Sequence, residues 1–286
     1  MRGIKTWEEL TIQDNFIFQR VMRNKRLCRL LIEIILGIKL RSITFPTTEK
    51  SIDVSYDSKS VRLDVYAEDE NGVLYDIEMQ TTDNASPDEL PKRTRYYQAM
   101  MDMDVLEKGA DYVDLRTTYI IFICTFDPFG EGRSIYTFEE TCKENKSLSM
   151  GDKTTKIFLN SKGSREGLHP DVAAFLDYVE GHAAKGHFTK TMAAEVERVK
   201  EHKETRVEYM TLAMEMKRQK KAGYLQGQEA GREEGRVEGR EEGRVEGLFL
   251  SALGMLQEKF PVEQVARITK LSVEQIRELG KTHGLL

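Results

Sequence analysis

The sequence predicts an α/β domain followed by a long polar helical segment and a small all-α module. Two segments that alternate apolar and polar residues, 61–67 and 73–80, flank the turn-forming pair Asn71–Gly72 and predict a β-hairpin. A continuous apolar run at 118–126 has the length of a central strand. Helical periodicity over 15–37 supplies a covering layer, so we expect a mixed sheet flanked by helices.

The other elements of the N-terminal domain, residues 1–187, follow from the same patterns. The first long helix is expected to end at Gly37, because glycine suits a helix C-terminal cap. We expect a second helix over 88–107, short strands over 134–138 and 155–159, and a closing helix over 171–181.

A helical linker is expected over 188–247, with glycine at every fourth position from 223 to 247. Each glycine costs a helix up to ~1 kcal/mol relative to alanine, so we expect a marginal helix that is flexible or ordered by self-association. Residues 248–286 read as a small helical module, with Pro261 at a first helical position and a Ser272–Gln275 capping box. This half of the chain is the expected route to a homo-oligomer.

Composition limits the compartment and the class of protein. The 286 residues are 40% hydrophobic and carry a net charge of −5, which suits about two folded units. No run approaches the ~18 apolar residues of a membrane helix, and the N-terminus lacks an apolar signal core. The three cysteines, Cys28, Cys124 and Cys142, fit neither a disulfide framework nor a zinc site. We therefore expect a cytoplasmic protein with no membrane partner.

The net charge conceals an uneven distribution along the chain. Residues 61–86 hold seven acidic residues and one Arg, whereas residues 20–29 are basic through Arg20, Arg23, Lys25, Arg26 and Arg29. The acidic total is therefore weak evidence against nucleic acid. It is better evidence for a bound metal, and the local basic groups predict modest, salt-sensitive DNA affinity.

The hairpin brings two carboxylates together. If the turn centres on Asn71, Asp64 lies opposite Glu78, with Cβ atoms only ~4.5–5.5 Å apart. Opposed like charges destabilise a sheet unless a cation, a raised pKa or full exposure relieves them. A divalent metal is the chemically productive solution, and an exposed polar strand face is the alternative.

The spacing Asp64, thirteen residues, Glu78, one residue, Gln80 resembles the signature of PD-(D/E)XK nucleases. More narrowly, the chain resembles bacterial recombination-promoting nucleases (Rpn) and related transposases. The likeness continues in order through residues 14–22, 61–80, 89–112, 119–130 and 155–163 and into the glycine repeat. Leu63 replaces the proline of the signature, and Gln80 replaces the lysine.

This resemblance implies a restriction-endonuclease-like core and a Mg²⁺-dependent DNA endonuclease that serves recombination or transposition, with Mn²⁺ as a substitute ion. It implies that Asp64 and Glu78 bind metal and act in catalysis together with Gln80. Gln80 can orient water but supplies no charge, which makes slow or metal-demanding cleavage an expectation. Glu33, on the first long helix, resembles an additional metal-shell carboxylate; a solvated edge position is its alternative.

Candidate DNA contacts come from two basic groups. Arg93 and Tyr97 are four residues apart, so they share a helix face that could meet the phosphate backbone. Arg20, Arg23 and Arg26 form a candidate phosphate track. Core packing for Tyr97 and plain solvation for the arginines are the alternatives. Two rival functions stay open: a catalytically weak or inactive DNA-binding or assembly protein that retains the nuclease fold, and a homo-oligomeric scaffold.

Overall fold

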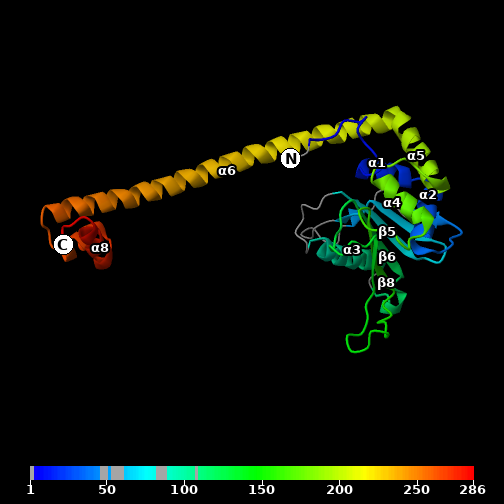
Figure 1. The fold of residues 1–286 in the computed structure, drawn as a ribbon, viewed down its shortest axis with the longest axis horizontal. Helices are drawn as coiled ribbons and strands as arrows, with labels where there is room; N and C mark the ends of the chain where they lie inside the picture. Colours follow the sequence, from blue (N-terminus) through cyan, green and yellow to red (C-terminus); the bar gives the residue numbers. More distant parts are fainter. Residues whose placement is uncertain (1–2, 46–50, 53–60, 82–88, 107–108) are drawn as a thin grey trace. The chain divides into compact units, whose positions relative to one another are not determined.

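The computed structural model describes residues 3–45, 51–52, 61–81, 89–106 and 109–286 (Figure 1). The chain divides into two compact units, Met1–Thr211 and Leu212–Leu286. The first contains a mixed sheet flanked by helices, and the second is helical. The predicted α/β class with a helical C-terminal part is therefore confirmed.

The sheet of the first unit has six strands. Their order across the sheet is β1 (Ile43–Thr44), β4 (Val65–Asp69), β5 (Leu74–Gln80), β6 (Thr118–Cys124), β8 (Thr154–Asn160) and β7 (Ile135–Phe138). The central strands β5, β6 and β8 are parallel, and the outer pairs are antiparallel. Two further short strands, β2 (Ser51–Ile52) and β3 (Val61–Arg62), pair with each other. The strands predicted over 73–80, 118–126, 134–138 and 155–159 are present, and the one predicted over 61–67 is divided between β3 and β4.

β4 and β5 form the predicted hairpin in the predicted register. Val65 pairs with Ile77, and Tyr66 pairs with Asp76. Gly72 in the turn has a φ of +76°, a conformation that favours glycine because other residues carry a Cβ. The alternation of apolar and polar residues was sufficient to fix this register, since a slip of one residue would exchange the two faces.

Helices cover both faces of the sheet (Figure 1). α3 (Glu89–Val105) lies on one face, where Met100 and Met101 share a core with Ile120, Phe122 and Phe158. α1 (Asn15–Met22), α2 (Lys25–Leu36), α4 (Pro170–Val179) and α5 (Gly186–Glu201) lie on the other face. A short 3₁₀ helix, η1 (Tyr112–Asp114), precedes β6.

The single helix predicted over 15–37 was wrong, because the structure has two helices with a break at 23–24. The side-chain oxygen of Asn24 accepts hydrogen bonds from the backbone N–H groups of Arg26 (3.1 Å) and Leu27 (3.3 Å), so it starts a new helix. Apolar periodicity continues through the break and hides it, whereas asparagine favours such caps over helix interiors. The predicted cap at Gly37 is confirmed by its left-handed conformation.

α5 belongs to the first unit. Phe188, Met192 and Val196 are buried, and the helix contacts α1, α2 and α4. The expected domain limit at residue 187 falls at the beginning of this helix, whereas the compact unit continues to Thr211.

The C-terminal part is built on α6 (Lys203–Gln257), which continues through the glycine repeat without interruption. Ion pairs between Glu233 and Arg236 and between Glu241 and Arg244 accompany the repeat. The glycine content alone predicts only a marginal helix there. None of the helices that the structure describes combines the length and apolarity needed to cross a bilayer.

Two short helices complete the second unit. α7 (Val262–Thr269) and α8 (Val273–Thr282) share a small core with the last turns of α6, formed by Ala252, Leu256, Val265, Ala266 and Ile276. The predicted capping box of Ser272 and Gln275 is present at the start of α8. Pro261 is the N-cap of α7 and not its first helical residue, a shift of one position from the expectation.

Candidate active site

Asp64 lies at a break in the strand predicted over 61–67. β3 ends at Arg62 and β4 begins at Val65, so Leu63 and Asp64 belong to neither strand. Leu63 is buried in the core beneath α3, which anchors the break. The break leaves Asp64 facing the C-terminal end of β5, where Glu78 lies.

Reciprocal hydrogen bonds join Asp64 to β5. The backbone N–H of Asp64 donates to Oε1 of Glu78 at 2.8 Å. The backbone N–H of Met79 donates to Oδ2 of Asp64 at 3.1 Å. Each carboxylate thus accepts from the backbone of the opposite segment, which relieves part of the repulsion between them. The structure brings the two predicted motif acids together.

Gln19 of α1 also holds Asp64, and sequence reasoning missed it. Its side-chain Nε2 donates to Oδ1 of Asp64 at 2.7 Å. The two residues are 45 positions apart, and Gln19 comes from the helical layer on the face opposite α3. Its place within the family-like segment 14–22 was the one available sign of its importance.

Asp76 is a third acid at this place. Its side chain is 0% exposed, and that of Glu78 is almost as deeply buried, at 3%. With the acids ionised, neither carboxylate oxygen of Asp76 has a hydrogen-bond partner among the described residues. A proton shared with the neighbouring Glu78 carboxyl would provide one. The sequence placed Asp76 on the same strand face as Glu78, but its burial depends on the covering helix α3.

Burial raises the pKa of both buried acids well above their ordinary values. For Asp76 the like charge of Asp64 adds to the effect of burial on the pKa. A hydrogen bond from Glu78 and the positive charge of Arg93 oppose this rise. For Glu78 the like charges of Asp76 and Asp64 add to burial, while the Asp64 N–H and Arg93 oppose it. A carboxylate that is removed from water requires a proton or a cation. This corner of the sheet therefore favours positive charge.

Arg93 of α3 provides part of that charge. Its Nη2 donates to Oε1 of Gln80 at 2.9 Å and lies 3.8 Å from Oε2 of Glu78. The guanidinium lies over two rings, 5.4 Å from the centroid of Tyr97 and 5.2 Å from that of Phe122. Arg93 and Tyr97 thus share a face, as predicted, and that face meets the carboxylates and the core.

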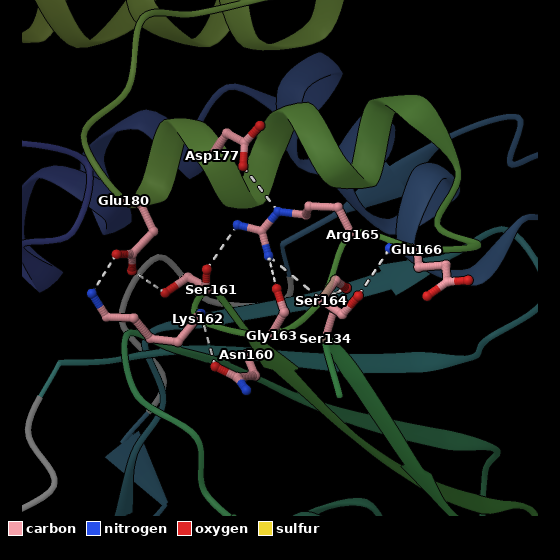
Figure 2. A network of polar contacts seen from close by, with 10 residues as sticks. All are labelled: Ser134, Asn160, Ser161, Lys162, Gly163, Ser164, Arg165, Glu166, Asp177 and Glu180. Atoms are coloured by element: carbon pink, nitrogen blue, oxygen red, sulfur yellow. Dashed lines mark hydrogen bonds and ion pairs between the residues drawn. The ribbon is translucent and has the colours of Figure 1, made fainter. Parts of the chain in front are cut away.

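The strand ends beside Gln80 are held by a polar network around Arg165 (Figure 2). The Arg165 guanidinium donates to Asp177 of α4 (2.9 Å) and to the carbonyls of Gly163 (2.8 Å) and Ser161 (2.7 Å). The Ser161 N–H in turn donates to the Cys124 carbonyl at the end of β6 (2.9 Å). The Gln80 carbonyl accepts from the Thr125 N–H next to it (3.0 Å). The network therefore ties α4 to the edge of the sheet at which the site lies.

The structure does not bring Glu33 into this carboxylate cluster. Glu33 is buried, and its Oε1 accepts from the backbone N–H of Leu40 at 2.9 Å. Arg29 and Lys39 lie 3.6 and 3.7 Å from its carboxylate oxygens. The burial of Glu33 does not match the solvated position, and the metal-shell role stays a prediction. These contacts give the carboxylate a structural role, in which it fixes the segment after α2.

The basic cluster lies on α1 and α2. Arg20 forms an ion pair with Glu208 at 2.7 Å and lies over the ring of Phe16. Arg23 and Arg26 are exposed. The cluster is a surface feature, and Arg20 is already engaged by acid and ring.

The residues of the site fit a divalent cation. Asp64 and Glu78 offer the hard oxygen donors that Mg²⁺ prefers, and the unpartnered oxygens of Asp76 leave excess negative charge beside them. Within the described part of the chain, no group of three or more His, Cys, Asp or Glu side chains has the arrangement of a metal site. Water and backbone carbonyls would have to complete the shell.

Comparison with known proteins agrees with this geometry. Residues 15–226 match the family model described as "PD-(D/E)XK nuclease family transposase". The match includes both motif acids, Gln80, Gln19 and Arg93. The searches of curated proteins and of solved structures found no match. Since the family model covers well over half of the chain, the protein belongs to the PD-(D/E)XK nuclease family transposases.

Proposed function

We propose that the protein is a Mg²⁺-dependent DNA endonuclease that hydrolyses phosphodiester bonds during recombination or transposition, with Mn²⁺ able to replace Mg²⁺. The observation that supports this proposal most strongly is the reciprocal hydrogen bonding of Asp64 and Glu78. It holds two metal-binding carboxylates side by side in a member of a nuclease family.

Each residue of the site has a distinct task in this proposal. A divalent ion bound at this site would polarise the scissile phosphate and lower the pKa of the attacking water. Asp64 and Glu78 would hold that ion, and Gln19 keeps the Asp64 carboxylate in one orientation. Gln80 carries no charge, so its task is to orient the attacking water and not to neutralise charge on the phosphate.

DNA would be held mainly through its phosphates. Arg20, Arg23 and Arg26 on α1 and α2 are the proposed contacts, and Arg23 and Arg26 are exposed. Phosphate contacts carry no base information, so we expect low sequence preference and an affinity that falls with salt. The proposed compartment is the cytoplasm, consistent with free thiols at Cys28, Cys124 and Cys142.

The direct test is nicking of supercoiled plasmid by the purified protein with Mg²⁺, Mn²⁺ or EDTA. We expect cleavage with either ion and none with EDTA. Asp64→Asn keeps the shape of the side chain but removes its charge, and should lower the rate by about 100-fold or more. Equal cleavage by wild type and Asp64→Asn, purified in parallel, would contradict the proposal.

Two observations favour binding without efficient cleavage as a second candidate. Both carboxylate oxygens of Asp64 already accept protein hydrogen bonds, and Gln80 replaces a lysine. A catalytically weak DNA-binding or assembly protein would shift labelled duplex in a gel yet leave plasmid intact with every divalent ion tried. Mg²⁺-dependent nicking that Asp64→Asn abolishes would exclude this candidate.

A further inference from the structure

Arg93 is a cation that lies against the acids of the site, as the described side chains show. The backbone N–H of Asp64 donates to Glu78, and the buried Asp76 lies two residues before Glu78 on the same strand face. The Nη2 of Arg93 lies 3.8 Å from Glu78 and 2.9 Å from the Gln80 amide oxygen. Arg93 thus brings positive charge to these acids from α3 and not from the strand that carries Glu78 and Gln80.

The guanidinium is held in place before any substrate arrives. The guanidinium lies over the rings of Tyr97 and Phe122, at 5.4 and 5.2 Å from their centroids. Its Nη2 donates a hydrogen bond to the side-chain oxygen of Gln80. Aromatic faces attract a guanidinium and restrict its motion. The Arg93 side chain remains 30% exposed, so part of it is accessible from solvent. A preorganised charge of this kind stabilises a transition state more than a mobile one does.

We propose that Arg93 supplies the positive charge that Gln80 cannot, by contacting the phosphate on which negative charge develops during cleavage. This inference rests on the proposed nuclease function and adds a catalytic residue to it. Gln80 then acts as a positioning residue, since its oxygen holds the guanidinium at the place where the third motif residue ends. The planar guanidinium can donate to Gln80 and to a phosphate oxygen at the same time.

A purely structural role for Arg93 predicts different behaviour. If Arg93 only packed on Tyr97 and held the carboxylates in place, its removal would lower stability and disorder the carboxylates. Metal binding and cleavage would then weaken together. If the Arg93 charge acts on the phosphate, its removal should change ion affinity and cleavage rate in opposite directions, because the acids are left more negative. Divalent ions should then bind more tightly while cleavage slows.

The experiment compares four variants of the full chain: Arg93→Ala, Arg93→Lys, Gln80→Lys/Arg93→Ala and the control Arg95→Ala. Arg95 is exposed on the same helix and lines a separate cavity of about 560 Å³ with Phe138 and Lys156. Single-turnover nicking gives the rate at saturating protein, and Mn²⁺ titration gives ion affinity without cleavage.

We expect Arg93→Ala to lower the saturated nicking rate by roughly 100-fold and to tighten Mn²⁺ binding by on the order of tenfold. Arg95→Ala should change neither by more than about twofold. Arg93→Lys should keep part of the rate, because the charge is retained but the planar contact with Gln80 is not. Gln80→Lys/Arg93→Ala should recover at least about tenfold of the loss, since the charge returns on the strand.

Two results would overturn the inference. The first is an unchanged nicking rate at saturation in Arg93→Ala. If only the concentration required to reach saturation changed, Arg93 would contact DNA in the ground state and would not stabilise the transition state. The second is Mn²⁺ binding that stays the same or weakens in Arg93→Ala. Failure of the nuclease proposal looks different, with no metal-dependent nicking by wild type beyond Asp64→Asn; Mn²⁺ affinity would still decide whether Arg93 opposes the ion.

Discussion

The hydrogen bond from Gln19 to Asp64 can be tested by changing one side chain. Gln19→Leu removes the donor at similar size, and Gln19→Glu replaces the donor by a carboxylate next to Asp64. Partners that orient metal ligands are worth about 10- to 100-fold in activity or metal affinity. We therefore expect nicking to fall by about tenfold in Gln19→Leu and further in Gln19→Glu.

Mn²⁺ affinity separates the two Gln19 variants. A loosened Asp64 carboxylate should bind the ion more weakly in Gln19→Leu, whereas the added carboxylate of Gln19→Glu should recover some ion affinity without recovering the rate. Identical rates for wild type and both variants would show that Gln19 only packs against the site.

At the scale of the residue, the hairpin register predicted from the sequence is the observed one, and Asp64 and Glu78 lie together as predicted, although Asp64 lies in a strand break that alternation does not predict. The sequence was insufficient for Gln19, since nothing local in it links two residues 45 positions apart. The sequence places Asp76 on the polar face of its strand, and such a face is expected to be exposed. Its burial follows only once α3 covers that face. Burial by a distant helix is a tertiary property.

Among the elements, α4 is bound to the loop after β8 through Glu180. Burial alone would raise the pKa of Glu180, but hydrogen bonds from Lys162 and Ser161 outweigh it and hold the pKa below the ordinary value of 4.5. A carboxylate whose folded pKa is depressed stabilises the fold above its unfolded pKa. That stability is lost as the pH falls through the folded value.

We therefore expect Glu180→Gln to be less stable than wild type at pH 7, by roughly 0.5–1 kcal/mol after solvent screening. The difference should shrink as the pH falls below about 4.5. Urea unfolding of both proteins at pH 7 and at pH 3.5 measures it. Glu166→Gln, a change in the exposed acid on the same loop, is the matched control. A difference that grows towards low pH would contradict the assignment.

The elements themselves were largely predictable, and the exceptions share a cause. Hydrophobic periodicity located the strands and α3, but it ran through the break between α1 and α2, where the Asn24 cap decides. In α6 the local cost of glycine argues for a weak helix, yet the structure continues it from Lys203 to Gln257. Periodicity reports which face is apolar, and it does not report where a backbone changes direction.

For the whole molecule, we propose self-association through α6. The helix exposes large apolar side chains of the second unit, including Met214, Leu225 and Val237, which are 63%, 52% and 56% exposed. A helix that exposes several large apolar side chains can bury them against a second copy of the chain. We expect the full chain to sediment as a dimer or larger species, and the variant Met214→Glu/Leu225→Glu to shift towards monomer.

A shortened chain gives the matched control for self-association. It should end after Thr211 and not at 187, because Tyr209 lies against Trp7 and Phe16 and its hydroxyl donates to the Lys5 carbonyl. A monomeric full chain, or a chain ending at Thr211 that associates as strongly as the full chain, would remove α6 as the interface.

The candidate site joins three layers of the first unit. Gln19 comes from the helical layer on one face, Asp64, Glu78 and Gln80 from the sheet and its strand break, and Arg93 from the helix on the other face. Its geometry therefore depends on the spacing between layers, which no single element sets. Swelling of the domain that keeps helices and strands but loosens their packing would separate Arg93 from Gln80 first. Nuclease activity should then be lost before the secondary structure melts, so the protein should be active over a smaller range of temperature or denaturant than the range over which it stays folded.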